Sequence, residues 1–119
     1  MIQTTTTAIL APFEIWEIQL GNRTIKFFEP LLLTPFWLED DPNEPDDPPV
    51  TRGEYLGVER PDLEIFANGV NRRELWNCIC GDVRSAWLHF VRAEPDRLSP
   101  HGALIKKNYL RIAEEVGNE

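Results

Sequence analysis

The sequence predicts an α+β fold in one domain, and three observations carry this prediction. Two strand-like runs flank residues 21–22 with the spacing of a β-hairpin, and a second pair of short apolar runs follows between residues 55 and 66. A long amphipathic helix is predicted over residues 71–92. We therefore expect a mainly antiparallel sheet of four or five strands, packed by this long helix, with a short C-terminal helix. A length of 119 residues with 42% hydrophobic content suits a single domain over residues 1–119.

The first element is a hairpin of residues 15–20 and 23–28. Gly21-Asn22 between them suits a primed two-residue turn, which fixes the strand register. Apolar and charged pairs then separate onto opposite faces, as cross-strand stabilisation requires. The predicted pairs are Ile18 with Ile25, Trp16 with Phe27, and Glu17 with Lys26.

Further strands are predicted after the hairpin. Residues 31–33 and 36–38 are apolar, but Pro30 and Pro35 restrict any strand there to an edge or a bulge. Two short runs, at residues 55–58 and 63–66, flank Arg60-Pro61-Asp62, where proline and aspartate favour a bend. We expect these two runs to pair with each other.

An acidic, proline-rich loop is predicted at residues 39–49. This run has six of the 20 acidic residues, four prolines and no base. Mutual repulsion and proline keep such a segment extended and solvated. It is either a spacer between strands or a docking segment for a cationic partner, and ion binding is disfavoured because the spacing lacks an EF-hand pattern. The candidate partner-binding residues are Glu39, Asp40, Asp41, Asp46 and Asp47.

The helix over residues 71–92 is the most clearly marked element. Asn71 suits the N-cap, and Glu74 three residues later completes a capping box. Gly81 inside the helix costs roughly 1 kcal/mol against Ala, so we expect another backbone to pack closely there. Apolar residues recur at spacings of three and four, which predicts a core-facing stripe, with a ligand-binding surface as the alternative. The stripe is Leu75, Trp76, Ile79, Val83, Ala86, Trp87, Phe90 and Val91.

A second helix is predicted over residues 100–115. Ser99 suits the cap and Pro100 the first helical position. Apolar residues then follow helical spacing as far as Val116. We expect this helix to pack on the sheet or on the first helix, and covering a partner protein is the alternative.

No residue set matches a catalytic or metal-binding pattern. Asp82, Ser85 and His89 share a helix face, but the serine lies between the other two, which does not suit a nucleophilic triad. Cys78 and Cys80 point in nearly opposite directions from a helix, so they form neither a disulfide nor a metal clamp and are expected to be reduced thiols. We therefore predict no catalytic residue, no metal site and no cofactor.

The chain also lacks the marks of a membrane or nucleic-acid partner. A formal net charge of −8 disfavours binding to phosphate backbones. The first 13 residues contain no Lys or Arg and only a short apolar stretch, unlike a signal peptide, and no apolar run is long enough to span a membrane. Cytoplasmic residence is the resulting expectation.

Residues 54–91 resemble the N-terminal domain of HicB-type antitoxins. The matching residues are Tyr55, Pro61-Asp62-Leu63, Gly69 and Glu74. The resemblance covers about a third of the chain and implies a small sheet with a helix that binds and blocks a ribonuclease toxin. Many members also have a C-terminal DNA-binding segment, but the residues after Val91 are too few for a full helix-turn-helix.

These observations favour a non-enzymatic protein-binding module. The leading hypothesis is an antitoxin-like or immunity-like inhibitor whose acidic surface meets a basic partner, possibly a toxin. One alternative is a small enzyme whose dispersed carboxylates, such as Asp62, Glu64 or Asp82, converge in a cleft with perturbed pKa values. Another is a structural subunit that forms homo-oligomers through an exposed strand edge.

Overall fold

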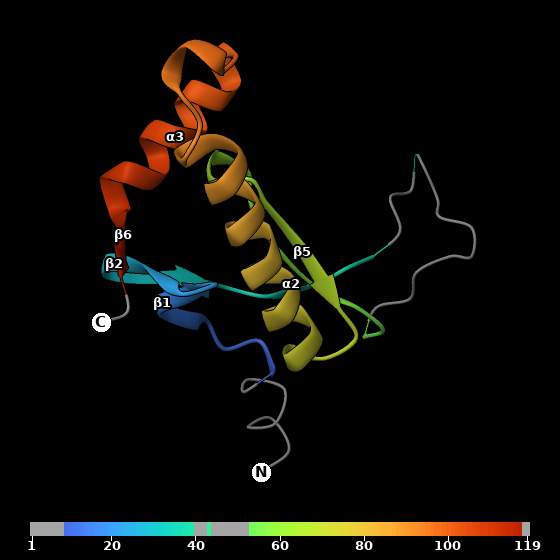
Figure 1. The fold of residues 1–119 in the computed structure, drawn as a ribbon. Helices are drawn as coiled ribbons and strands as arrows, with labels where there is room; N and C mark the ends of the chain where they lie inside the picture. Colours follow the sequence, from blue (N-terminus) through green and yellow to red (C-terminus); the bar gives the residue numbers. More distant parts are fainter. Residues whose placement is uncertain (1–8, 40–42, 44–52, 118–119) are drawn as a thin grey trace.

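The computed structural model describes residues 9–39, 43 and 53–117 as an α+β fold with two antiparallel sheets. Sheet A has the strand order β1-β2-β6, and sheet B has the order β3-β4-β5. The long helix α2 lies against both sheets, between sheet A and β5 (Figure 1), and the second helix α3 lies beyond one end of it. The core fills the space between these elements and includes Ile25, Leu56 and Ile79.

Sheet A begins with the predicted hairpin, β1 (Phe13–Leu20) and β2 (Arg23–Leu33). Gly21 has a φ of +63° in the connecting turn, and Asn22 stays out of the left-handed region, as a type II′ turn requires. The register confirms the pairs Ile18 with Ile25 and Glu17 with Lys26.

The predicted pairing of Trp16 with Phe27 is wrong. The ladder breaks between Ile15 and Glu17 and resumes with Ile15 opposite Leu31. Pro30, which has no N–H to donate, lies between Lys26 and Leu31, in the stretch of β2 that has no partner residue in β1. The break leaves Phe27 buried and turns Trp16 outward, with 55% of its surface exposed.

The third strand of sheet A is β6 (Ala113–Gly117), which pairs antiparallel with β2. The prediction of a helix as far as residue 115 is therefore wrong, because α3 (Pro100–Ile112) ends earlier. Helical spacing in a short apolar run does not exclude a strand. Here the edge of β2 offers backbone partners to residues 113–117, and Glu115 gains three side-chain partners. The start of α3 agrees with the prediction, since Ser99 Oγ accepts the Gly102 N–H at 3.0 Å.

Sheet B contains β3 (Phe36–Trp37), β4 (Leu56–Arg60) and β5 (Ile65–Gly69). β4 and β5 pair as predicted, around a single helical turn at Pro61–Leu63. β3 is a two-residue edge strand, in keeping with the restriction that Pro35 imposes. The expected single sheet of four or five strands is thus two sheets of three. The chain changes from sheet A to sheet B at Thr34-Pro35, where proline cannot continue a ladder.

Helix α2 (Arg72–Ala86) has the predicted cap and continues as one wider, π-helical turn over Trp87–Val91. Asn71 Oδ1 accepts the Glu74 N–H at 2.9 Å, while the Glu74 carboxylate accepts the N–H of Val70 rather than that of Asn71. Trp87 is 1% exposed, which confirms it as core. Trp76 is only partly buried and stacks on Phe13 with ring centroids 5.8 Å apart.

The expectation for Gly81 is wrong. Gly81 is exposed, and a Cβ added there would meet no atom within 4 Å. Gly69 is the glycine that a close approach requires, because a Cβ there would lie 2.6 Å from the Leu75 backbone nitrogen. In the described residues, no helix is long and apolar enough to cross a bilayer.

Candidate functional site

The acidic residues proposed for partner binding lie mostly outside the described residues. Glu39 follows β3 and is exposed. Asp40, Asp41, Asp46 and Asp47 belong to the ranges 40–42 and 44–52, so the contacts of the predicted docking segment stay a prediction.

The outer face of sheet A displays three large apolar side chains, which we call the outer patch: Trp16, Phe28 and Leu32. Each is more than half exposed, at 55%, 55% and 58% respectively. Their neighbours Ile15 and Leu31 are buried in the core, and successive side chains of a strand point to opposite faces. The outer patch therefore faces away from the core.

Carboxylates surround the outer patch. Glu14 lies opposite Leu32 in the ladder, and its Oε1 accepts the Trp16 indole N–H at 3.1 Å. Glu17, Glu29 and Glu114 are exposed on the same three strands, and Lys26 pairs with both Glu17 and Glu114 in the register. The exposed face of sheet A thus has an apolar centre with a mainly acidic rim.

Glu115 links β6, at the edge of sheet A, to other elements of the fold. Its carboxylate accepts the Trp87 indole N–H at 2.8 Å, two hydrogen bonds from Arg92 at 2.9 and 3.1 Å, and one from Arg23. The hydrogen bonds from Arg92, with those of Trp87 and Arg23, lower the Glu115 pKa from 4.5 to about 2. One ionised side chain thus joins β6 to β2 and to the end of the long helix.

Two of the three carboxylates named for a dispersed enzyme site do meet in a cleft. Glu64 and Asp82 line a cavity of about 380 Å³ together with Ser85 and His89. His101 from α3 reaches into the same region and contacts the Glu64 carboxylate. Glu64 is the one non-glycine residue of the described part with a positive φ, at +56°. Backbone strain of this kind is common at functional sites.

The groups in this cleft are already occupied by structural bonds. Asp82 Oδ2 accepts the Phe66 N–H at 2.9 Å, which satisfies one backbone donor on the edge strand β5. His89 Nδ1 lies 2.8 Å from the Ser85 carbonyl oxygen, so this nitrogen acts as a donor and is not a base for the Ser85 hydroxyl. The geometry agrees with the rejection of a nucleophilic triad.

Asp62, the third carboxylate, lies elsewhere. It forms a two-bond ion pair with Arg60, at 3.0 and 2.9 Å, and this contact lowers the pKa of Asp62. Within residues 9–39, 43 and 53–117, no group of three His, Cys, Asp or Glu side chains could hold a metal ion. Cys78 and Cys80 are free, and burial raises the pKa of the Cys80 thiol.

The residues that resemble the HicB pattern have local structural roles here. Pro61–Leu63 forms the turn between β4 and β5, Gly69 ends β5, and Glu74 caps α2. None of them belongs to the outer patch. No family model, curated protein or solved structure matches the chain.

The outer patch was not predicted from the sequence, although one signal was present. Ile15 and Ile18 are both large and apolar but three residues apart, and strict alternation cannot bury both. Such spacing indicates a break in the strand, and a break near Trp16 exposes it.

Proposed function

We propose that this protein is a non-enzymatic binding module that docks a basic protein partner through the outer patch, as an antitoxin-like or immunity-like inhibitor does. The observation that supports this most is the exposure of Trp16, Phe28 and Leu32 beside several carboxylates on an uncovered sheet face. Tryptophan in the centre of an interface often contributes much of the binding energy. The resemblance to HicB-type antitoxins is consistent with this role.

Charge gives the proposal a kinetic form. An acidic surface and a basic partner attract each other over long range, so added salt slows their association. The acidic run at 39–49 contributes to this attraction, whereas apolar contacts at the outer patch govern dissociation.

The test compares matched variants on a partner isolated from the native host with the tagged chain and then purified. Replacing Trp16 and Leu32 together with Ser should weaken partner binding at least about tenfold, as expected for central interface residues. The control replaces Leu104 and Leu110 with Ser, because these α3 residues are similarly exposed, at 54% and 48%. Equal loss in the two double variants would contradict docking at the outer patch.

The charge argument has its own measurement. Changing Asp40, Asp41, Asp46 and Asp47 together to Asn should lower the association rate and flatten its dependence on ionic strength, with little change in dissociation. Association rates that are equal to the parent's at two ionic strengths would remove the electrostatic part of the proposal.

A second candidate is an enzyme that uses the cleft of Glu64 and Asp82. The convergence of these two carboxylates with His89 and His101 favours it. The proposal ranks lower because both Asp82 and His89 are engaged in backbone hydrogen bonds. Turnover of a host metabolite extract, followed by NMR, that occurs with the parent and stops with Glu64→Gln would support this candidate over the binding module.

A further inference from the structure

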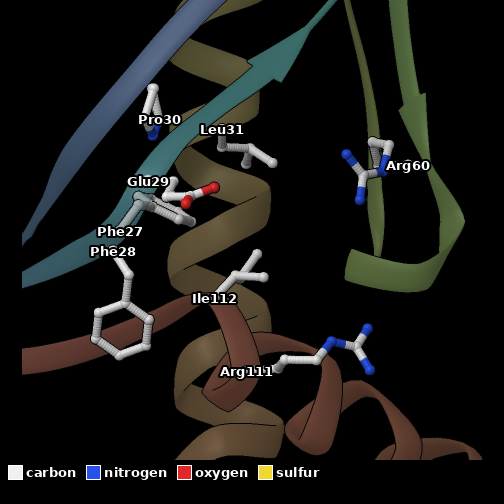
Figure 2. Close-up of a pocket in the computed structure, with 8 residues that line it drawn as sticks. All are labelled: Phe27, Phe28, Glu29, Pro30, Leu31, Arg60, Arg111 and Ile112. Carbon is white, nitrogen blue, oxygen red and sulfur yellow. The ribbon is translucent and has the colours of Figure 1, made fainter.

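A cavity of about 340 Å³ opens between β2, the end of β4 and the end of α3 (Figure 2). It borders the outer patch, because Phe28 and Glu29 also line it. It is at the lower end of the size range of small-molecule sites. Its apolar lining includes Leu31 and Ile112, and its charged lining consists of Glu29, Arg60 and Arg111. Figure 2 shows the two arginines on one side of the hollow and Glu29, from β2, on the other.

The two arginines keep donors for a further acceptor. Arg60 uses Nε and Nη2 for Asp62, which leaves Nη1. Arg111 donates from Nη2 to Asn108 Oδ1 at 3.3 Å, and within the described residues it forms no ion pair. Asp62 forms an ion pair with Arg60 and has only a longer-range attraction to Arg111, so the cavity has one guanidinium whose charge is not compensated by an ion pair. One negative charge on a ligand balances it, and a planar carboxylate matches the guanidinium fork.

Glu29 supplies the complementary charge. It is exposed on β2, and its carboxylate repels a bound anion but attracts an ammonium group. A doubly charged phosphate ester would satisfy the arginines and leave excess negative charge beside Glu29. A zwitterion satisfies both sides of the cavity, and its apolar side chain fits against Leu31 and Ile112.

We propose that this cavity binds a small zwitterion with an apolar side chain, of the class of apolar α-amino acids, whose carboxylate contacts Arg60 and Arg111 and whose ammonium contacts Glu29. The site lies apart from the cleft of Glu64 and Asp82. Its occupation requires no protein partner, so it is tested on the purified chain alone, and its failure leaves the proposed binding module untouched.

The experiment is an NMR titration of the isotope-labelled chain with leucine, with 4-methylpentanoate, which lacks the amine, and with leucinamide, which lacks the carboxylate. Leucine should give saturable shifts at the amides of Leu31 and Ile112 and should bind more tightly than either fragment. Inorganic phosphate is the probe for simple anion binding. Phosphate binding that equals or exceeds leucine binding at these amides would overturn the proposal.

Variants test each charge separately. Arg111→Gln should lower the affinity for leucine and for 4-methylpentanoate by about tenfold, the loss expected for one charge-assisted hydrogen bond. Glu29→Gln should lower the affinity for leucine but raise the affinity for 4-methylpentanoate. The substitution removes a negative charge that attracts the ammonium group and repels the carboxylate. Arg73→Gln, at an exposed arginine outside the cavity, should change neither.

Two outcomes contradict the site. If Arg73→Gln weakens leucine as much as Arg111→Gln does, the binding is a general effect of charge. If Glu29→Gln alters leucine and 4-methylpentanoate in the same direction, the ammonium is not recognised. All three substitutions replace exposed side chains, and unchanged amide spectra away from the cavity will verify that the variants are folded.

Discussion

The β4–β5 pair of sheet B and the β2–β6 pair of sheet A join segments at very different sequence separations. In sheet B, β4 and β5 are joined by the turn at Pro61–Leu63, and α2 begins soon after β5 ends. In sheet A, β6 at the far end of the chain pairs with β2, so that Arg23 lies opposite Gly117. The β4–β5 pair of sheet B, like the β1–β2 hairpin of sheet A, is specified by local turn chemistry, whereas sheet A gains its third strand only by a long-range pairing, in which Glu115 meets partners from other elements.

The largest expected effect on stability is at Trp87, which follows the last residue of α2 and contacts the C-terminal elements. Trp87 packs edge-on against Tyr109 and donates to Glu115. Trp87→Ala should lower the free energy of unfolding by about 3–5 kcal/mol, as measured by urea denaturation. Trp76→Ala, at a partly exposed side chain in the first half of α2, is the matched comparison and should cost less. Equal losses would mean that the two regions depend on their tryptophans alike.

The next effect is specific to sheet A. Glu115→Gln should destabilise by about 1–2 kcal/mol, a modest value because its arginine partners are partly exposed and screened by water. Asp62→Asn, which breaks the exposed pair with Arg60 beside sheet B, serves as the comparison and should cost less.

The pH dependence of that variant follows from the lowered pKa. Glu115 titrates at about 2 when folded, against 4.5 ordinarily, so the folded state binds its proton more weakly than the unfolded state. Its contribution is complete above pH 4.5 and is lost as the pH falls toward 2. The difference in stability between parent and Glu115→Gln should therefore shrink over this interval. A difference that is independent of pH would show that the ionised form has no special role.

A smaller effect on stability, of opposite sign, is expected in helix α2. Gly81→Ala should stabilise the protein by about 1 kcal/mol, because alanine favours the helix and its Cβ meets open space. Thermal unfolding checks this. A loss of stability instead would indicate that a Cβ at position 81 meets another part of the protein.

The smallest effect on stability is expected at the outer patch. Trp16→Ala should change the free energy of unfolding by less than about 0.5 kcal/mol, since the side chain is mainly solvent-exposed. The free energy of unfolding is measured by denaturation of the purified chain without a partner. A large loss would show that Trp16 supports sheet A itself and would weaken its assignment to partner binding.

The sequence alone determined the elements whose causes are local. The turn at Gly21-Asn22, the caps at Asn71 and Ser99, and the buried Trp87 follow from residue types at fixed spacing. The sequence also indicated Glu64 and Asp82 as candidate carboxylates of an enzyme site, and the fold brings both to one cleft.

Tertiary structure decided the rest. Residues 113–117 have a pattern that fits a helix or a strand, and only the open edge of β2 and the partners of Glu115 make them β6. The cavity between Arg60 and Arg111 likewise depends on contacts between distant segments, whereas Pro30 and Pro35 give local reasons for the break at Trp16 and for the change of sheet. Local propensity differs by a fraction of a kcal/mol per residue, so burial and long-range pairing decide where local signals are balanced.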